Sequence, residues 1–180
     1  MMFFWIALAV VAVVAIMYYN RFVRLRNKVE ESWSGVDVQL KRRYDLIPNL
    51  LETVKGCAKH EKELFENVTK ARTMAMSAEK VGDQSAAENM LSQSLKSLFA
   101  VAENYPDLKA NANFQQFQQQ LSQIEEQIQL ARRYYNAVVR DNNNAVETFP
   151  GVLLAGPFGF HTFEYFEAGA AERENVQVKF

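Results

Sequence analysis

The residues best suited to chemistry are one cysteine and two histidines. Cys57 and His60 lie three positions apart, which on a helix brings their side chains close enough for half of a metal site. No second pair completes the site, because the remaining histidine, His161, is far away in the sequence. The segment His60-Glu61-Lys62-Glu63 also lacks the second histidine of a metalloprotease helix. We therefore expect no metal and no cofactor.

Other catalytic patterns are not found in the sequence either. Nucleophilic catalysis needs a base held against a Ser, Cys or Thr, and no nucleophile-elbow glycine pattern surrounds any serine. No glycine-rich segment of the phosphate-binding type precedes a helix. Glu30-Glu31 and Glu125-Glu126 are adjacent pairs, and adjacent helical residues point about 100° apart. These pairs suit solvated faces or partners for nearby arginines, and we expect no enzyme.

The charge distribution argues against a nucleic-acid partner. The chain has 180 residues, with 20 Lys and Arg against 21 Asp and Glu. Four of the basic residues, Arg21, Arg24, Arg26 and Lys28, lie close together without an acid between them, so the rest of the chain is mildly acidic. A nucleic-acid-binding domain is normally basic. The single cysteine excludes an intramolecular disulfide and suits a reducing compartment.

The segment from Met1 to Tyr19 contains no charge, no amide and no hydroxyl other than those of its two tyrosines. As a helix it covers about 28 Å, close to the roughly 30 Å hydrocarbon thickness of a bilayer. A cleaved signal begins with positive charge and ends in small residues, whereas here the basic residues follow the apolar run. We therefore expect an uncleaved transmembrane helix over residues 1–19. Aromatic residues stand at both of its ends, where they would contact lipid headgroups: Phe3, Phe4, Trp5, Tyr18 and Tyr19.

The basic residues that follow the run predict its orientation. The positive-inside bias puts Arg21, Arg24, Arg26 and Lys28 in the cytoplasm and the N-terminus outside. The sequence thus predicts a single-pass protein of the cell (inner) membrane with a cytoplasmic C-terminal domain. The same four residues could also bind anionic lipid, at about 1 kcal/mol per charge near the surface.

Apolar residues recur at helical spacing through residues 20–146. The first stripe, from Phe22 to Leu40, follows the span without an intervening break. Asp45 can cap a new helix and Pro48 fits its first turn, so a turn is expected there. A continuous helix kinked at Pro48 is the alternative, because Ile47 extends the earlier periodicity.

Three more helices are expected, at about 46–79, at 85–105 with Pro106 ending it, and at 111–144. The last carries a stripe from Phe114 to Val138, with Ile124 in its core, over more than three heptads. The pattern predicts an all-α fold, in which a transmembrane helix continues into an antiparallel four-helix bundle over residues 20–146.

Residues 147–180 form a different, irregular tail. Phe149-Pro150-Gly151 and Gly156-Pro157 interrupt any helix, yet the segment is rich in aromatic residues. A bundle whose helices alternate in direction returns this tail to the membrane face. One hypothesis places the segment 149–166, with Phe149, Phe158 and Phe160, in the lipid headgroup region. The alternative is that these aromatics cover the membrane-proximal end of the bundle or a neighbouring subunit.

The chain also resembles a known family, the LemA family of bacterial membrane proteins. The resemblance covers nearly the whole sequence and rests on motifs that include Trp33 with Val36-Asp37-Val38-Gln39-Leu40-Lys41-Arg42-Arg43, Asp45-Leu46-Ile47-Pro48-Asn49-Leu50, Tyr105-Pro106-Asp107-Leu108-Lys109-Ala110-Asn111, Ala131-Arg132-Arg133-Tyr134-Tyr135-Asn136 and Phe158-Gly159-Phe160. The resemblance implies an N-terminal anchor, a cytoplasmic helical bundle and no known catalytic activity. A relative takes part in building magnetosome membranes. The family offers no established set of functional residues.

These observations predict a membrane-anchored helical scaffold or adaptor of the LemA type. Its expected partners are membrane lipids and an unidentified membrane or cytoplasmic protein, with a second copy of the chain as a further possibility. The alternative is a lipid-binding protein that organises or remodels the membrane through residues 21–28 and 149–166.

Overall fold

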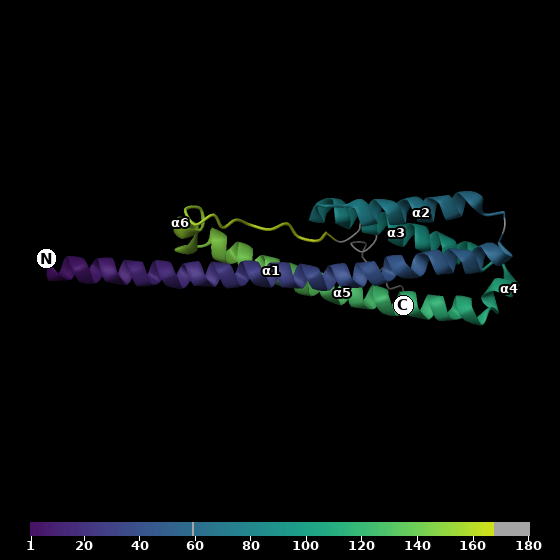
Figure 1. The fold of residues 1–180 in the computed structure, drawn as a ribbon, viewed down its shortest axis with the longest axis horizontal. Helices are drawn as coiled ribbons and strands as arrows, with labels where there is room; N and C mark the ends of the chain where they lie inside the picture. Colours follow the sequence, from purple (N-terminus) through teal and green to yellow (C-terminus); the bar gives the residue numbers. More distant parts are fainter. Residues whose placement is uncertain (59, 168–180) are drawn as a thin grey trace, which may run out of the picture. The chain divides into compact units, whose positions relative to one another are not determined.

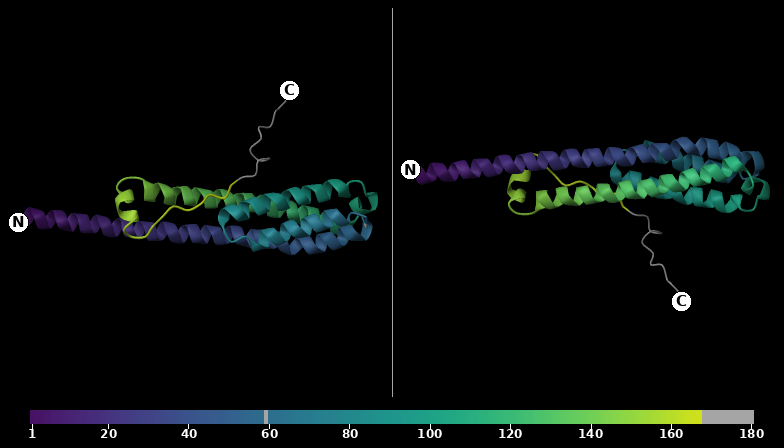
Figure 2. Two further views of the ribbon diagram at one scale, coloured as in Figure 1. Left: turned by 90° about the horizontal axis from the view of Figure 1, so that it is seen from above. Right: turned by 90° about the horizontal axis from the view of Figure 1, so that it is seen from below.

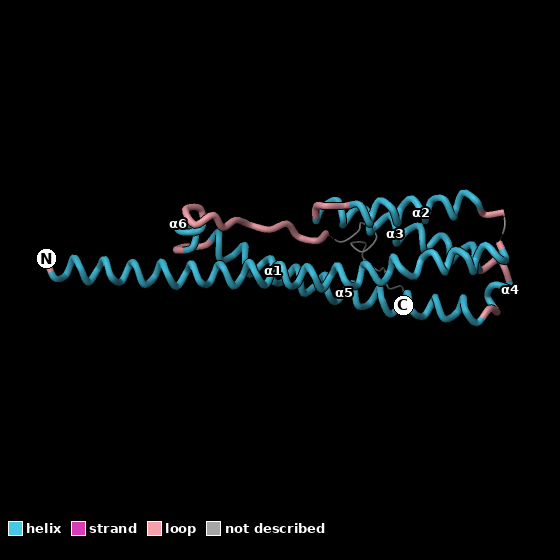
Figure 3. The backbone as a smooth tube through the Cα atoms, viewed as in Figure 1, coloured by secondary structure: helices cyan, strands magenta, loops and turns pink. Residues whose placement is uncertain are grey.

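The computed structural model describes residues 1–58 and 60–167, and in these ranges every regular element is a helix (Figure 1; Figure 3). The all-α fold expected from the sequence is confirmed. The elements are α1 (Met2–Cys57), α2 (Lys62–Ser77), α3 (Val81–Ala102), α4 (Pro106–Lys109), α5 (Ala112–Glu147) and α6 (Gly151–Ala155).

The chain divides into two compact units. Unit 1 consists of Met1–Asp37 and Ala131–Tyr165, and unit 2 consists of Val38–Leu130 with the described residues from Phe166 on. The long helices α1 and α5 therefore each contribute residues to both units. The four-helix bundle and the three segments 1–19, 20–146 and 147–180 stay predictions.

Helix α1 continues through the position where a turn was expected. It is one helix of 56 residues with Pro48 inside it, so the prediction of a turn at Asp45 and Pro48 is wrong and the continuous alternative is correct. The apolar stripe explains the continuity, because Ile47, Leu50 and Val54 are all buried in unit 2. The expected second helix, 46–79, accordingly begins only at Lys62.

Pro48 is tolerated because its missing hydrogen bond is replaced from another helix. A proline has no amide hydrogen, so it leaves the carbonyl four residues earlier, that of Tyr44, without its usual helical donor. The Nε–H of Arg72, on α2, donates to that carbonyl at 2.9 Å. The side chain of Pro48 is exposed, so its ring also avoids the buried side of the helix.

Helices α2 and α3 pack against each other in unit 2. Phe65, Val68 and Ala71 are buried on α2, and Leu91 and Leu98 are buried on α3. The sequence placed the second of these helices at 85–105, whereas it begins at Val81 and ends at Ala102. Pro106 lies at the start of the short helix α4 instead of directly ending the longer helix, as a proline in a first turn can.

Helix α5 agrees closely with the expected range 111–144. Its start is fixed by Asn111, whose side-chain oxygen accepts hydrogen bonds from the amides of Asn113 and Phe114 at 2.9 and 3.2 Å. Most of the predicted stripe is buried, but Ile124 is only partly buried, so its expected place in the core is corrected. The fully buried stripe residues are Phe114, Leu121, Ile128, Tyr135 and Val138.

Unit 1 has its own small core, formed by Phe22 of α1, Ala145 and Val146 of α5 and Ala155 of α6. Both views in Figure 2 show α6 beside α1, next to the end of α5. The tail expected to be irregular thus contains a short helix. Its residues 168–180 lie outside the described part of the chain.

Gly151 allows α6 to approach α5 this closely. A Cβ atom at this position would lie 2.0 Å from the carbonyl oxygen of Ala145 and 3.4 Å from Cζ of Phe22. The first distance is far inside van der Waals contact with a backbone atom. Only glycine fits this position without moving α6.

Candidate functional site

The N-terminal part of α1 suits a lipid environment. Among the described residues, α1 is the one helix that is long and apolar enough to cross a membrane. Side chains of the apolar segment are almost all exposed, including those of Phe3, Phe4 and Trp5 at its N-terminal end. Phe4 and Trp5 stack edge to face, with 5.8 Å between ring centroids. Their contact with lipid headgroups stays a prediction.

An aromatic cluster forms at the other end of the apolar segment. Tyr19 makes edge-to-face contacts with Phe158 and Phe160, with centroid distances of 5.4 and 5.7 Å, and Phe22 lies 5.1 Å from Phe160. Tyr18 in turn packs beside Phe22 at 6.0 Å. Phe158 and Phe160, which were predicted to contact lipid, therefore also contact α1. Phe158 and Tyr19 are nevertheless 40% and 45% exposed, and lipid contact of this cluster stays a prediction.

The four basic residues follow this cluster on α1 and have exposed side chains. The guanidinium of Arg21 lies 5.9 Å from the ring centroid of Tyr18, and that of Arg26 lies 5.7 Å from that of Phe160. The ammonium of Lys28 lies 6.0 Å from the Tyr134 ring on α5. Positive charge is thus concentrated beside the aromatic cluster, within the same unit.

The most exposed apolar surface of the tail lies on and just before α6. Phe149 is 79% exposed, Val152 50% and Leu153 64%. Phe149 was named among the predicted lipid contacts, whereas Val152 and Leu153 were included only through the segment 149–166 that one hypothesis placed in the headgroup region. The signal that could have found them is the run Val152-Leu153-Leu154, of which only Leu154 packs against the core of unit 1. We call Phe149, Val152 and Leu153 the α6 apolar face.

Polar side chains of α5 hold the segment that follows α6. Asn143 donates from Nδ2 to the carbonyl of Phe163 and accepts from its amide, each at 2.9 Å. Asn142 donates to the carbonyl of His161 at 3.2 Å, and the hydroxyl of Tyr135 donates to that of Glu164 at 3.0 Å. No sequence pattern indicated this role for the two buried asparagines. Burial, and secondarily the charge of Glu164, raises the pKa of Tyr135 to about 12.

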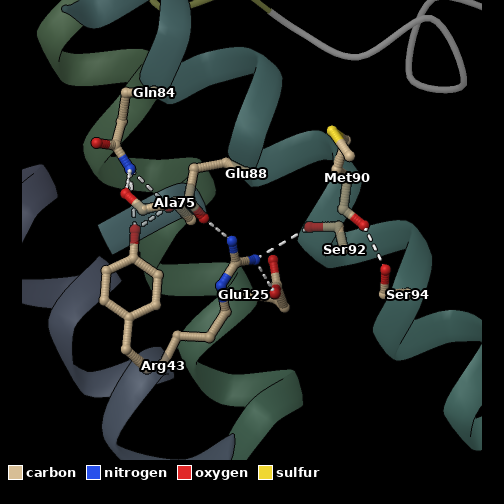
Figure 4. Close-up of polar contacts among 9 residues, drawn as sticks. Arg43, Ala75, Gln84, Glu88, Met90, Ser92, Ser94 and Glu125 are labelled. Atoms are coloured by element: carbon tan, nitrogen blue, oxygen red, sulfur yellow. Dashed lines mark hydrogen bonds and ion pairs between the residues drawn. The ribbon is translucent and has the colours of Figure 1, made fainter. Parts of the chain in front are cut away.

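A cluster of charged residues is buried in unit 2. The Arg43 side chain of α1 forms ion pairs with Glu88 of α3 and Glu125 of α5, and donates to the hydroxyl of Ser92 at 3.0 Å. Figure 4 shows these groups converging on the guanidinium. Arg43 and Glu88 are almost fully buried, whereas Glu125 is about one third exposed. Of the two possibilities for Glu125 left open by the sequence, partnership with an arginine is the correct one.

The hydrogen bonds of Glu88 continue into a second layer of polar side chains. Its carboxylate accepts from the hydroxyl of Tyr44 and from Nε2 of Gln84, the latter at 2.7 Å. Gln84 also donates to the Tyr44 hydroxyl and to the carbonyl of Ala75, at 2.9 and 3.0 Å. Because the central ion pair has almost no exposed surface, this cluster suits fixing three helices together better than it suits binding a substrate.

The structure does not bring Cys57, His60 and His161, the residues first considered for metal chemistry, together in one site. Cys57 and His60 are both exposed, and His161 lies in the segment after α6. Within the described ranges, no group of three or more His, Cys, Asp or Glu side chains is placed to hold a metal ion. Glu61, beside His60, accepts a hydrogen bond from Tyr105 at 2.9 Å, and this bond raises the pKa of the tyrosine.

Comparison with known proteins identifies relatives across nearly the whole chain. It is 28% identical to magnetosome protein MamQ 2 of Paramagnetospirillum magneticum, over 89% of this chain and 69% of the relative. It is 25% identical to protein LemA of Metamycoplasma hominis, over 98% and 81% of the two chains. With MamQ of Magnetospirillum gryphiswaldense the identity is 26%, over 89% and 71%.

The family comparison agrees with these relatives and with the apolar helix. None of the relatives bears the name of an enzyme. Together with the N-terminal part of α1, they support a membrane-associated helical protein. The model of the LemA family matches residues 32–180, and the chain therefore belongs to the LemA family.

Proposed function

We propose that the protein is a non-enzymatic, membrane-anchored scaffold that binds a protein partner at the cytoplasmic face of the membrane. The observation that carries the proposal is the continuity of α1. The same helix supplies the apolar segment of residues 1–19 and buried residues of both units, such as Phe22 in unit 1 and Leu50 in unit 2. A domain that shares its own core helix with an anchor is held at the membrane without a flexible linker.

The surface that we assign to the protein partner lies on α2 and α3. Met90 is 47% exposed and borders two surface hollows of about 520 and 320 Å³. Met74, which is 40% exposed, borders the larger hollow. Methionine side chains are flexible and polarizable, so they adapt to the apolar surface of a partner. Charged residues such as Lys80 and Asp83 line the same hollow and supply polar contacts around it.

Site-specific photo-crosslinking in native membranes tests this function. A photoreactive residue replaces Met90 in the full chain, and a matched one replaces the exposed Gln127 on α5 as a control. The expected result is an adduct of defined protein mass from position 90 only. An adduct of twice the chain mass would identify self-association. Equal labelling from both positions, or lipid adducts alone, would contradict the proposal.

The chain also offers a matched pair of substitutions. Met90→Glu places a charge between the two hollows, whereas Met76→Glu changes a methionine that is 54% exposed and lines neither of them. Both positions are exposed, so both variants should keep the helical circular dichroism of the native protein. Only Met90→Glu should abolish co-purification of the partner that the crosslinking experiment identifies.

A membrane-organising role is the second candidate. The exposure of Arg21, Arg24, Arg26 and Lys28 beside the aromatic cluster favours it, because such residues attract anionic lipid. Reconstitution of the full chain into anionic vesicles, followed by electron microscopy, distinguishes it from scaffolding. Tubes or clusters of vesicles, reversed by changing these residues to glutamine, would support the second candidate. Unchanged round vesicles would reject it.

A further inference from the structure

The α6 apolar face has no packing partner within unit 1, although the opposite side of α6 is well packed. Ala155 is 2% exposed and belongs to the core with Phe22, and Gly151 is buried against Ala145. Phe149, Val152 and Leu153 are between 50% and 79% exposed. Three neighbouring apolar side chains held outward by a packed backbone form a surface that water disfavours.

The position of α6 along α1 is fixed by direct contacts. Gly151 and Ala155 pack against Phe22, and Phe158, which follows α6, contacts Tyr19. A helix rises about 1.5 Å per residue, so Tyr19 and Phe22 are separated by about 4.5 Å along the axis. Each headgroup layer is about 5 to 7 Å thick. A span that ends at Tyr19 therefore places α6 at the depth of the headgroups.

The charges next to this surface select the type of bilayer. Arg21, Arg24 and Arg26 have exposed side chains within the two helical turns that follow Tyr19. The Arg26 guanidinium lies over the ring of Phe160, the residue that also contacts Tyr19. Cations at this depth attract anionic headgroups. Tyr19 and Phe158, which contact each other, are also 45% and 40% exposed.

From this placement we propose that the α6 apolar face inserts into the headgroup region of the anionic bilayer that α1 spans. Phe149, Val152 and Leu153 enter the boundary between headgroups and acyl chains, while Phe158 and Phe160 brace α6 against α1. The proposal concerns lipid contact alone and does not depend on the scaffold function or on membrane remodelling. It assigns Val152 and Leu153 to lipid and gives Phe160 an internal role instead.

Spin-label accessibility in reconstituted vesicles tests the insertion. Cys57→Ser removes the single native thiol, and Leu153→Cys then carries the label in the full chain, in vesicles of phosphatidylcholine and phosphatidylglycerol. Oxygen concentrates in the bilayer and the neutral nickel complex NiEDDA in water. We expect the label at position 153 to be accessible to oxygen. Its accessibility to NiEDDA should be at least several-fold lower than that of a label at Val38→Cys. Val38 is exposed on α1 in unit 2.

Two reference labels make the outcomes distinct: Val38→Cys sets the value for water, and a second label sets the value for lipid. A label at Val11→Cys, in the span, sets the value for lipid. If the label at position 153 meets NiEDDA as readily as that at Val38→Cys, the face is in water and the proposal is wrong. Low accessibility to both reagents would show that protein covers the face, which also overturns it. NiEDDA accessibility at position 153 should rise in vesicles of phosphatidylcholine alone, and equal values would reject the choice of an anionic bilayer.

Discussion

At the scale of single residues, Arg43 is the buried cation of unit 2 on which the charged cluster depends. Its guanidinium compensates two carboxylates, and one of them, Glu88, is only 4% exposed. Bringing such charges out of water is costly, and their mutual attraction offsets the cost only while all partners are present. The cluster therefore favours one arrangement of α1, α3 and α5, since any other arrangement would leave a buried charge without a partner.

Arg43→Ala should destabilise the protein by about 3 to 5 kcal/mol, because it leaves Glu88 buried without its cation. Urea unfolding of the full chain in detergent, followed by circular dichroism, measures the loss. Lys41→Ala is the control, since Lys41 pairs with Asp45 on the exposed side of the same helix. That change should cost at most about 1 kcal/mol. Similar losses for the two variants would show that the buried cluster contributes nothing special.

Tyr135 predicts a specific dependence on alkaline pH. The pKa of its phenol is raised from 10.0 to about 12, so between these values the unfolded chain releases a proton that the folded chain keeps. Stability therefore falls as the pH rises through this range, and the effect is not present below pH 10. Tyr135→Phe should cost about 1 kcal/mol at pH 8 through the lost hydrogen bond to Glu164.

The test is the difference in unfolding free energy between the native protein and Tyr135→Phe, measured from pH 8 to pH 11.5. This difference should shrink above pH 10, because only the native protein loses the contribution of Tyr135. Titration of the other tyrosines and of the lysines affects both proteins and cancels in the comparison. A difference that is constant over the whole range would contradict the assignment.

Residue patterns also show why the buried cluster was missed. Arg43 follows Leu40 by three residues and precedes Ile47 by four, and Glu88 precedes Leu91 by three. Both charged residues therefore occupy buried positions of apolar stripes. Such positions show that a charge needs a partner, but the spacing within one helix does not tell which residue on another helix supplies it. The three-dimensional packing of α1, α3 and α5 determines the pairing.

At the scale of elements, α1 shows how tertiary contacts override a local rule. Asp45 and Pro48 have the chemistry of a helix start, and the sequence alone favoured a turn. The helix continues because Ile47 and Leu50 are buried on its stripe, and because Arg72 donates to the carbonyl that Pro48 leaves without an amide donor. By contrast, α5 was predictable because its cap, Asn111, and its apolar stripe lie within a single stretch of sequence.

A double-mutant cycle tests the link between Pro48 and Arg72. Arg72→Met removes the donor to the Tyr44 carbonyl and should cost about 1 to 2 kcal/mol. In a Pro48→Ala background the new amide can donate to that carbonyl, so the same change should cost about 1 kcal/mol less. Chemical unfolding of the four proteins gives the coupling. Costs that add to within about 0.5 kcal/mol would show that the two residues act independently.

At the scale of the whole molecule, the native cysteine can report which side of the membrane carries the helical units. Cys57 is exposed and is the only cysteine in the sequence. With the N-terminus outside, a membrane-impermeant maleimide should label Cys57 only after cells are permeabilised. A Met2→Cys, Cys57→Ser variant should be labelled in intact cells, since Met2 is exposed at the N-terminal end of α1. The reverse pattern would invert the predicted topology.

The family and the all-α fold could be predicted because their signals are distributed along the chain. The exposure of the individual tail aromatics could be predicted only in part. Phe149, Phe158 and Phe160 look alike in the sequence, yet Phe149 is exposed while Phe160 packs on Tyr19 and Phe22. Which side of a short tail faces inward depends on the position of Gly151 against Ala145, and a glycine reveals this only when its neighbours in space are known.

The hydrogen bond between Arg72 and Tyr44 also has a consequence for the choice of register between α1 and α2. An apolar stripe by itself allows one helix to slide along another by a turn, because the next set of apolar residues offers similar contacts. The carbonyl exposed by Pro48 occurs at one height on α1, and Arg72 reaches it from one height on α2. Sliding by one turn, about 5.4 Å, would separate donor from acceptor. Pro48, which has no amide hydrogen to donate, therefore selects the alignment of α1 and α2 in which the Tyr44 carbonyl still has a donor.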